Sequence, residues 1–445
     1  MILGAGPTGL GAAYRLQELG YKNWSIFEAA DVVGGLARSF TDEKGFTYDV
    51  GGHIIASHYD YYDKLVDKLL GNDFTRMQRQ AWIYLMNTWI PYPFQNNIRY
   101  LPLNALIECL MGMIKAQSAD NTGKQINNFR QFTLAHFGEG IANYFMLPYN
   151  FKVWAHPAEI MSKDWIGERV ATVDIERILR NIIAQKDDVT FGPHNWFKFP
   201  LYGGTGGLFS RYVPYIQDHL HLKTPATGID PLKRTVTFAN GCSIEYDFLL
   251  STMPLTELLA VIDGVPSEIS DYSKDLLYSS GFSIGVGINR PTETNKCWMY
   301  FPEANTPFYR VTYLSQYSPH IAPANTTLFL AEVSESRYKP VSRERLLEAT
   351  IDGLITVGLM EENERNLIIA TKVIPVKYWY PIPSLDRDRA LSVIQPYLMK
   401  QNIFSRGRFG SWLYEVGNMD HATMMGVEFV NNVLNDEPEV TWKHR

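Results

Sequence analysis

The chain opens with MILGAGPTGLG, which places glycines in a G-x-G-x-x-G spacing directly after a short apolar run. Gly4 permits a tight turn, Gly6 lets the backbone approach a pyrophosphate, and Gly9 lets the next helix pack closely on a sheet. The N-terminus of that helix offers N–H groups and a positive dipole to phosphates. Glu28 ends the following apolar run about 20 residues further on, where a carboxylate binds ribose hydroxyls. This pattern predicts a dinucleotide-binding strand–helix–strand unit; the alternative is an accidental glycine turn.

The bulk composition limits the class of protein. A chain of 445 residues is long enough for two or three structural units, and its net charge of −6 argues against a nucleic-acid partner. The cysteines Cys109, Cys242 and Cys297 form no CxxC pair, which is typical of thiols in a reducing compartment. Because neither a signal-peptide pattern nor an apolar run of about 18 residues is present, we expect a cytoplasmic protein without a membrane partner. The run before Gly4 is short, so either the first strand is short or the natural start lies upstream.

The periodicity of apolar residues changes along the chain. Patterns with helical spacing fill most of the stretch from Leu103 to Gln185 and predict a helical module inserted into an α/β framework. Short apolar runs separated by turn signals follow and predict a mostly antiparallel sheet. These predicted strands cover 235–238, 248–251, 282–288, 298–301, 309–314, 327–333 and 367–376. Helices are predicted over 343–357 and 420–434.

Further glycine pairs follow the first loop. Gly34 and Gly35 precede Arg38, and Gly51 and Gly52 precede His53. Paired glycines let the backbone contact a flat ligand, and an arginine neutralises phosphate. Each pair by itself is also typical of a plain turn. Three glycine clusters within the first 53 residues favour a ligand-binding segment.

Aromatic residues beside amides or arginines form the remaining candidate site. Tyr92 and Gln95 lie in PYPFQNN, and Asn150 and Trp154 lie in PYNFKVWA; such groups stack on and hydrogen-bond a base, although buried aromatics beside turn amides have the same appearance. Three arginines with aromatic and glycine neighbours suit a phosphorylated ligand: Arg169, Arg310 and Arg408.

The sequence offers no group of its own for nucleophilic catalysis. It contains no zinc-type spacing, since His219-x-His221 stands alone on a predicted helix, and no metal is expected. It also has no GxSxG motif and no Ser/His/Asp order. A bound cofactor is therefore expected to carry the chemistry.

Taken together, these motifs closely resemble those of the UDP-galactopyranose mutase family of the eukaryotic type. The shared strings run in order over nearly the whole chain and are very specific as a set. They are GAGPTGLGAA, GGLA, YDVGGH, PYPFQNN, PYNFKVWA, GERVA, GGTGG, KCWMYFP, PFYR, EVSES and SRGRFGSWLYEVGN.

The resemblance implies an α/β fold with a flavin-binding Rossmann-type domain, an inserted helical bundle and a six-stranded antiparallel sheet domain. The flavin-binding domain is expected in three parts, at 1–80, 197–260 and 395–445. The helical bundle is expected over 98–196, and the sheet domain that binds substrate over 81–97 and 261–394.

The resemblance also implies the activity. The family interconverts UDP-galactopyranose and UDP-galactofuranose, which needs reduced FAD and proceeds through an adduct between flavin N5 and the sugar. NADPH is one candidate reductant, and assembly into a homo-oligomer is left open. The runner-up is an oxidoreductase of the flavin amine-oxidase type; a mutase for another UDP-sugar and a non-enzymatic nucleotide-sugar sensor are further alternatives.

Carried over residue by residue, the family's motifs assign three overlapping sets. The resemblance implies cofactor contacts for Gly4, Gly6, Pro7, Thr8, Gly9, Glu28, Gly34, Gly35, Leu36, Ala37, Arg38, Gly51, Gly52, His53, Gly407, Arg408, Asn418 and Met419. It implies substrate contacts for Tyr92, Gln95, Asn150, Trp154, Arg169, Tyr300, Arg310, Tyr317, Tyr380 and Tyr414. It implies catalytic roles for His53, Arg169, Arg310 and Arg408.

The chain departs from the family pattern at several positions. Ala56 stands where an aromatic residue is expected beside the uracil, His194 where an amide is expected, and Met419 where glutamine is common. A long insertion after Pro319 and an extended C-terminal tail are missing. These departures bear on sugar preference, loop closure and the oligomeric state, and not on the flavin.

Overall fold

The computed structural model describes residues 1–118, 125–167, 173–189 and 195–442. Its N-terminal α/β unit is built on a five-stranded parallel sheet in the order β19-β13-β1-β2-β9. These strands are short and mostly buried, as expected for a sheet covered on both faces. Their bounds are β1 Ile2–Leu3, β2 Ile26–Phe27, β9 Leu220–His221, β13 Leu249–Ser251 and β19 Ile403–Ser405.

Two helices from opposite ends of the chain cover this sheet. Helix α1 (Pro7–Glu18) packs against α13 (Met419–Asn435), the predicted closing helix. Glycines allow the close crossing, because a Cβ at Gly426 would lie 2.0 Å from the Thr8 carbonyl oxygen. A Cβ at Gly11 would lie 2.4 Å from the carbonyl oxygen of Thr423. The C-terminal segment is therefore part of the dinucleotide-binding unit.

The second sheet differs from the expectation in strand number and direction. Among the described residues it has seven strands in the order β18-β14-β17-β16-β15-β6-β7, not six, and β15 pairs with β6 in parallel. The other neighbouring pairs are antiparallel. The bounds are β6 Ala81–Leu85, β7 Thr88–Pro91, β14 Tyr278–Ile288, β15 Trp298–Tyr300, β16 Arg310–Tyr313, β17 Thr327–Glu335 and β18 Ile368–Pro381.

The predicted helical module is present. Helix α3 (Leu103–Ser118) packs on α4 (Phe129–Ile141) through glycines, since a Cβ at Gly140 would lie 2.5 Å from the Cys109 nitrogen. A π-helical turn over Ala142–Met146 leads into α5, and α6 closes the module. Their bounds are α5 Leu147–Trp154 and α6 Ile175–Ile183.

Smaller elements complete the fold. The small antiparallel sheets pair β3 Ser39–Thr41 with β4 Thr47–Asp49, the distant segments β5 Phe74–Gln78 and β8 Trp196–Pro200, and β10 Ala226–Asp230 with β11 Thr235–Phe238 and β12 Ser243–Glu245. The remaining α-helices are α2 Asp60–Leu70, α7 Gly204–Ser210, α8 Val213–Ile216, α9 Leu255–Val261, α10 Ser267–Ser273, α11 Leu346–Thr356 and α12 Arg387–Met399.

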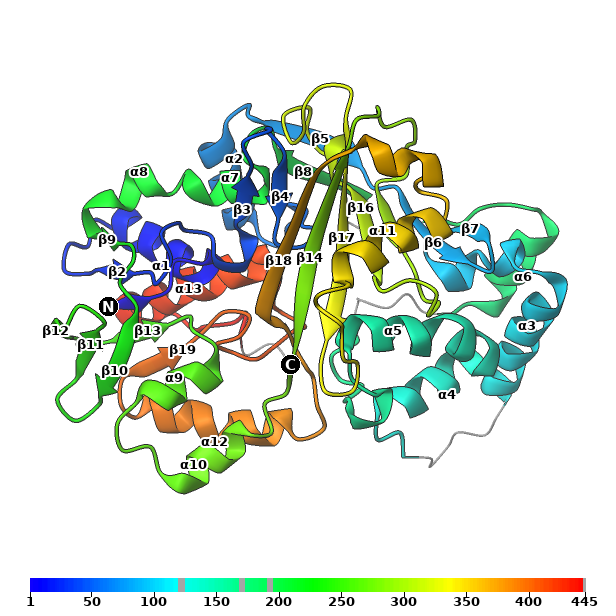
Figure 1. The fold of residues 1–445 in the computed structure, drawn as a ribbon. Coiled ribbons are helices and arrows are strands. Elements are labelled where there is room, and N and C mark those ends of the chain that lie inside the picture. The colour runs from blue at the N-terminus through cyan, green and yellow to red at the C-terminus, as the bar shows by residue number, and fades with distance from the viewer. Residues whose placement is uncertain (119–124, 168–172, 190–194, 443–445) are drawn as a thin grey trace.

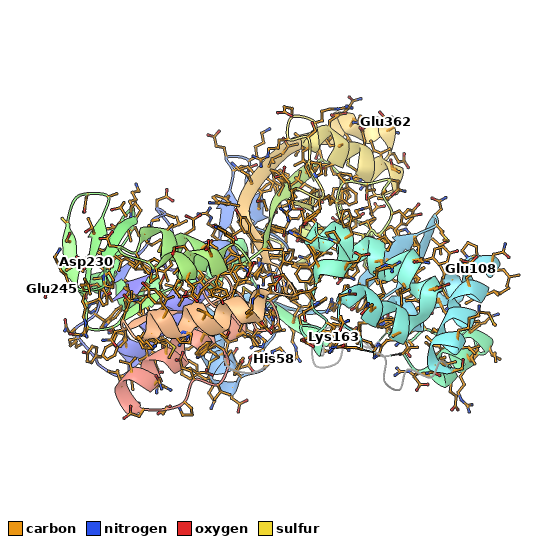
Figure 2. All side chains as sticks on the ribbon, turned by 90° about the horizontal axis from the view of Figure 1, so that it is seen from below. His58, Glu108, Lys163, Asp230, Glu245 and Glu362 are labelled. Atoms are coloured by element: carbon orange, nitrogen blue, oxygen red, sulfur yellow. The ribbon has the colours of Figure 1, made fainter. Side chains whose placement is uncertain are left out.

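The long strands β14, β17 and β18 stand between the dinucleotide-binding unit and the helical module (Figure 1). In the view from below, Asp230 and Glu245 mark the outer end of the dinucleotide-binding unit and Glu108 marks the outer end of the helical module. His58 lies between these two ends (Figure 2). No helix in the described ranges is long and apolar enough to cross a membrane.

Candidate active site

The first glycine loop lies between β1 and α1. A Cβ at Gly9 would lie only 1.9 Å from the Gly4 carbonyl oxygen, so this residue allows the helix to pack on the turn. Gly6 is different, because the nearest atom to a Cβ there would be the Gly35 Cα at an ordinary 3.8 Å. Pro7 occupies the first turn of α1, where a missing N–H costs nothing. The space above Gly6 is thus open for a ligand.

Glu28 lies beside this loop as predicted. One carboxylate oxygen accepts a hydrogen bond from the Ala5 N–H at 2.7 Å, and the other accepts from the Ala30 N–H at 2.8 Å. Two backbone donors fix the position of the carboxylate next to the glycine turn. The arrangement is the one that a dinucleotide-binding unit uses for ribose hydroxyls.

The second glycine segment contacts the first. The Gly34 N–H donates to the Ala5 carbonyl oxygen at 2.8 Å, and Gly34 and Gly35 both have positive φ angles, 108° and 55°. Leu36 and Ala37 continue this short turn, which ends at Arg38. The guanidinium of Arg38 lies 5.2 Å from the centre of the Phe40 ring, and its Nε is buried without a hydrogen-bond partner among the described residues. A buried, unsatisfied guanidinium nitrogen fits an anionic ligand.

The third segment leads to His53. Gly51 has a φ of +82°, and the Gly52 N–H donates to Oε1 of Glu332 at 3.0 Å. The Nδ1 atom of His53 is buried and has no hydrogen-bond partner among the described residues. Burial, reinforced by the charges of Arg310 and Arg408 and opposed by Glu332, lowers the pKa of His53 to about 4. The ring is therefore neutral at pH 7.

The C-terminal segment returns to the first loop. A Cβ at Gly407 would lie 2.5 Å from Oγ1 of Thr8, and the positive φ of +89° also favours glycine. Arg408 donates from Nη1 to the Gly417 carbonyl oxygen at 2.9 Å. Asn418 and Met419 then form the N-cap and first residue of α13. The predicted residues from both ends of the chain therefore lie around one cradle.

A continuous group of aromatic rings and arginines lies between the sheet domain and the helical module. Tyr300 is central: its ring centre lies 5.4 Å from that of Tyr92 and 5.4 Å from that of Tyr149. The Tyr149 ring approaches Tyr309 at 6.5 Å. Arg79 donates to the Tyr300 hydroxyl at 3.0 Å. We call this group, together with Trp154, Arg310, Tyr317, Tyr380, Arg408 and Tyr414 described below, the aromatic–arginine cluster.

A second half of the cluster joins the C-terminal segment. The Trp154 ring lies 5.4 Å from Tyr380 and 4.6 Å from Tyr414, measured between ring centres. The Arg408 guanidinium lies 5.2 Å from the Tyr380 ring centre and 5.4 Å from that of Tyr414. Asn150 accepts the Trp154 indole N–H at 3.0 Å, so this amide orients the ring. Arg408 is thus common to the cradle and the cluster.

Arg310 is held in the cluster by a buried carboxylate. Its Nε donates to Oε1 of Glu332 at 2.6 Å, and its Nη2 donates to Oε2 at 2.6 Å. The guanidinium carbon also lies 4.6 Å from the Trp298 ring centre. The guanidinium of Arg310 therefore has a fixed orientation.

Tyr92, Tyr317 and Tyr380 are neutral hydrogen-bond donors at pH 7. Burial is the main cause that raises the pKa of Tyr92 and of Tyr380 to about 12. Burial also raises the pKa of Tyr317, whose ring packs against Phe197 and Phe199 with ring centres 5.2 Å apart in each pair. Neutral phenols and arginines together suit a polar anion such as a diphosphate.

Two predicted residues need separate mention. Gln95 is buried in the short 3-10 turn after Tyr92. Arg169 lies outside the described residues, as does His194, so neither is placed.

Four residues of the site had no role assigned from the sequence: Arg79, Tyr149, Tyr309 and Glu332. Arg79 belongs to no local motif. Its role depends on Trp298 and Tyr300, which are far away in the sequence: its guanidinium carbon lies 4.8 Å from the Trp298 ring centre, and it donates to the Tyr300 hydroxyl. Glu332 had a usable signal, because it is a single charged residue inside the apolar run TLFLAEV. A carboxylate in a central strand requires a buried partner.

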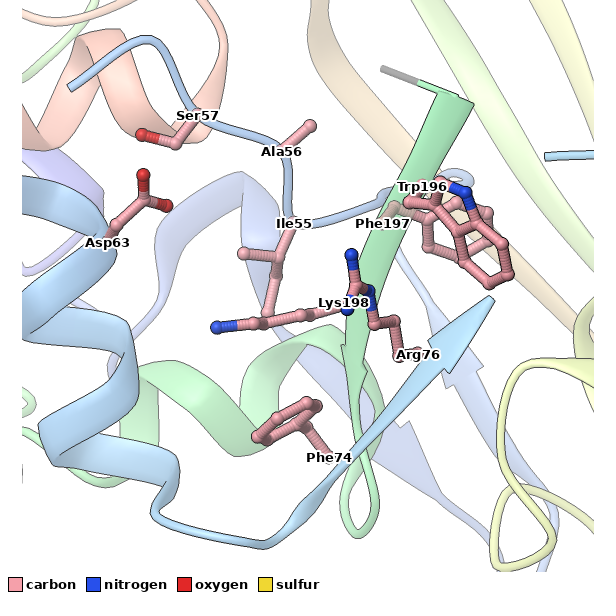
Figure 3. A pocket seen from close by; sticks show the side chains of 9 residues that line it. All are labelled: Ile55, Ala56, Ser57, Asp63, Phe74, Arg76, Trp196, Phe197 and Lys198. Atoms are coloured by element: carbon pink, nitrogen blue, oxygen red, sulfur yellow. The ribbon is translucent and has the colours of Figure 1, made fainter. Parts of the chain in front are cut away.

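A pocket of about 480 Å³ is lined by residues of α2, β5, β8 and the segment 55–57 (Figure 3). Arg76 and Trp196 lie next to each other on its wall, with a guanidinium-to-ring distance of 5.4 Å, and Phe197 connects it to Tyr317. Ala56, the first departure from the family pattern, is one of its lining residues. The small side chain therefore leaves space at this edge.

Two histidine groups have other roles. His219 and His221 do not lie together on an α-helix as predicted: His219 ends a 3-10 turn and stacks on Trp24, and His221 lies in β9 and stacks on Phe27.

His58, Asp420 and His421 form a separate group that could ligate a metal. Burial opposes ionisation of Asp420, but hydrogen bonds from both imidazoles lower its pKa to about 2. Because Asp420 lies in the first turn of α13, the helix dipole favours the carboxylate and disfavours a metal cation.

Comparisons with known proteins agree with this arrangement. The sequence profile of the flavin containing amine oxidoreductases matches residues 7–367. A crystal structure of reduced UDP-galactopyranose mutase matches 100% of this chain and 95% of that chain, with a TM-score of 0.97 and 43% identity. A putative protoporphyrinogen oxidase from Exiguobacterium shares the fold, with a TM-score of 0.73 and 15% identity over 97% of each chain.

Curated relatives match over a shorter stretch. The 15-cis-phytoene desaturase of Arabidopsis thaliana is 35% identical over 86 residues, which are 19% of this chain and 15% of the desaturase. The profile match and the full-length structural match cover far more of the chain. The chain belongs to the flavin containing amine oxidoreductase family and, within it, to the UDP-galactopyranose mutases.

Proposed function

We propose that this protein is a reduced-FAD-dependent isomerase that interconverts UDP-galactopyranose and UDP-galactofuranose. The observation that carries the proposal is the full-length match to a reduced UDP-galactopyranose mutase at 43% identity. The aromatic–arginine cluster supports it independently, because a diphosphate and a base need such groups. An amine-oxidase-type substrate would need no site with Arg79, Arg310 and Arg408 together.

The cradle fits FAD. The open space at Gly6, the fixed carboxylate of Glu28 and the unsatisfied Nε of Arg38 suit the adenosine and diphosphate of a dinucleotide. The unsatisfied Nδ1 of His53 and the first turn of α13 suit the flavin ring. We propose that the cofactor set inferred from the resemblance holds FAD in this way, with Gly407 and Arg408 beside the ring.

The residues of the cluster would bind and orient the nucleotide sugar. Tyr92 and Gln95 would hold the uracil. Trp154 would lie beside it, oriented by its hydrogen bond to Asn150. Arg310, Tyr300, Tyr317, Tyr380 and Tyr414 would hold the diphosphate. Charge-assisted hydrogen bonds to the departing diphosphate stabilise its developing negative charge.

Reduced FAD, when bound, supplies a nucleophilic nitrogen, N5, for the anomeric carbon of the sugar. The protein contributes a neutral His53, whose pKa of about 4 keeps positive charge away from this position at neutral pH. Buried aromatic rings exclude water, which would otherwise hydrolyse a reactive sugar. Arg169 is proposed to approach the same substrate, and NADPH is the proposed reductant of the flavin.

Product analysis separates this function from the alternatives. The protein is reduced under nitrogen and incubated with UDP-galactofuranose, and the products are separated by chromatography. We expect UDP-galactopyranose as the product. When the protein is later exposed to substrate and air, we expect only the hydrogen peroxide that reoxidation of the flavin itself produces. Oxidised product with stoichiometric peroxide would indicate an oxidase, whereas binding of UDP without conversion of any UDP-sugar would indicate a sensor.

A further inference from the structure

Both carboxylate oxygens of Glu332 accept hydrogen bonds from protein groups in the site. The residue is fully buried in β17, and both of its oxygens are used twice. Oε1 accepts from the Gly52 N–H at 3.0 Å and from Nε of Arg310 at 2.6 Å. Oε2 accepts from Nη2 of Arg310 at 2.6 Å and from the Tyr309 hydroxyl at 2.7 Å.

The ion pair is built into the sheet. Arg310 in β16 and Glu332 in β17 are direct cross-strand neighbours in an antiparallel pair, so the strand register brings them together. Two of the three guanidinium nitrogens are committed to the carboxylate. Only Nη1 has no acceptor among the described residues, and this group is left to meet a ligand. The carboxylate therefore determines which edge of Arg310 faces the substrate.

The negative charge of Glu332 does not itself favour binding of a diphosphate. A carboxylate next to a diphosphate site repels the ligand, because like charges at short distance are unfavourable. A site selected only for anion affinity would place a neutral acceptor at this position. The negative charge of Glu332 is explained if the carboxylate holds the Arg310 guanidinium in one orientation. A bidentate ion pair fixes a guanidinium in this way.

The same pair fixes the segment that leads to His53. The Gly52 N–H donates to Glu332, and the Gly52 carbonyl oxygen accepts from Nη2 of Arg310 at 3.3 Å. Both polar groups of this residue are thus bound by the ion pair. A Cβ at Gly52 would lie 2.9 Å from Oγ1 of Thr312 and 3.2 Å from Glu332, so the backbone is tightly seated.

We propose that Glu332 is a positioning residue that aims Arg310 at the substrate diphosphate and locks the Gly52 backbone in the segment proposed to contact the flavin. It couples the substrate-binding half of the site to the cofactor-binding half. The proposal rests on the proposed mutase function. It assigns Glu332 no contact with substrate or flavin.

A double-mutant cycle tests the proposal. UDP affinity of the FAD-loaded, oxidised protein and turnover per bound flavin of the reduced protein are measured for Glu332→Gln, Arg310→Lys and the double variant. We expect Glu332→Gln to lower UDP affinity and turnover by about 10- to 100-fold, as misaimed groups do. It should weaken UDP affinity by less than a further threefold in the Arg310→Lys background, because the guanidinium to be aimed is gone.

A matched control lies on the same strand. Glu335 in β17 pairs with the exposed Arg343 at 2.8 Å, and Glu335→Gln should leave both quantities unchanged. If Glu332→Gln fails to retain FAD, Glu332→Asp is measured in its place with the same expected losses, since its shorter side chain keeps the charge but withdraws the oxygens.

Two results would overturn the positioning role. One is a variant with normal FAD content whose UDP affinity and turnover stay within twofold of wild type. The other is a fully additive loss of UDP affinity in the double variant. Absence of turnover in the wild-type protein would instead refute the proposed function and leave the UDP titrations to decide on Glu332.

Discussion

Substitution of Gly6 separates a ligand-binding turn from a merely structural one. Gly6 has φ −77° and ψ −176°, which any residue adopts, and a Cβ there would meet nothing closer than 3.8 Å. The protein alone therefore accommodates alanine at this position. Fewer conformations of the unfolded chain should even stabilise the apoprotein by about 0.4–1 kcal/mol.

The cofactor gives the opposite result. If a pyrophosphate approaches the backbone at Gly6, the added methyl group occupies its space and breaks charge-assisted hydrogen bonds worth about 1.5–3 kcal/mol each. Gly6→Ala should therefore weaken FAD binding by about 10- to 150-fold. The assay measures FAD released from purified protein, the dissociation constant of FAD for the apoprotein, and the melting temperature of the apoprotein.

Two further variants calibrate the result. Gly9→Ala should lose both FAD and stability, because its Cβ would lie 1.9 Å from the Gly4 carbonyl oxygen. Gly228→Ala, in a remote strand where the nearest atom would be 3.9 Å away, should leave FAD affinity unchanged and stabilise the apoprotein by the same about 0.4–1 kcal/mol. Normal FAD affinity in Gly6→Ala would refute the inference that this turn binds the pyrophosphate.

Two more predictions concern the substrate and His53. Arg310→Lys keeps a charge beside the buried Glu332 but loses the forked donors, so UDP binding measured by calorimetry should weaken by about 10- to 150-fold at unchanged FAD content; unchanged affinity would remove Arg310 from the site. His53 binds its proton near pH 6.5 when unfolded but only near pH 4 when folded. Acidification from pH 6.5 to 4 should therefore destabilise the fold by up to about 3 kcal/mol through this group, fully so below pH 4. His53→Asn should lose less stability than wild type between melts at pH 7.5 and pH 4.5, and equal losses would contradict the shift.

The parts of the site that follow from local spacing could be predicted from the sequence. The turn at Gly4 to Gly9 and the acidic residue Glu28 lie within one strand–helix–strand unit, whose geometry depends on near neighbours. The buried strands from Thr235 to Val333 and the closing helix were also predicted because their apolar periodicity is regular, whereas the exposed strand β12 was not. Helix α12 was missed, since it begins with the charged run Arg387-Asp-Arg and contains Pro396, both of which weaken a helical pattern.

The parts that depend on register between distant segments could not be predicted in this way. The seventh strand of the sheet arises because β6 pairs in parallel with β15, far along the chain. The partner of Arg310 is identified only when β16 and β17 are aligned residue by residue. Arg79 likewise reaches Tyr300 through the fold and carries no local motif. The resemblance to the mutase family supplied the residue assignments that spacing alone left open.

Counting turnovers per electron pair tests the central claim most directly. The FAD-loaded protein is reduced under nitrogen with one equivalent of dithionite per flavin and then given excess UDP-galactofuranose, while flavin absorbance and products are followed together. We predict many molecules of UDP-galactopyranose per flavin with the flavin still reduced at the end, and none from the oxidised protein. One product molecule per electron pair with reoxidised flavin, or equal turnover by the oxidised protein, would contradict the account.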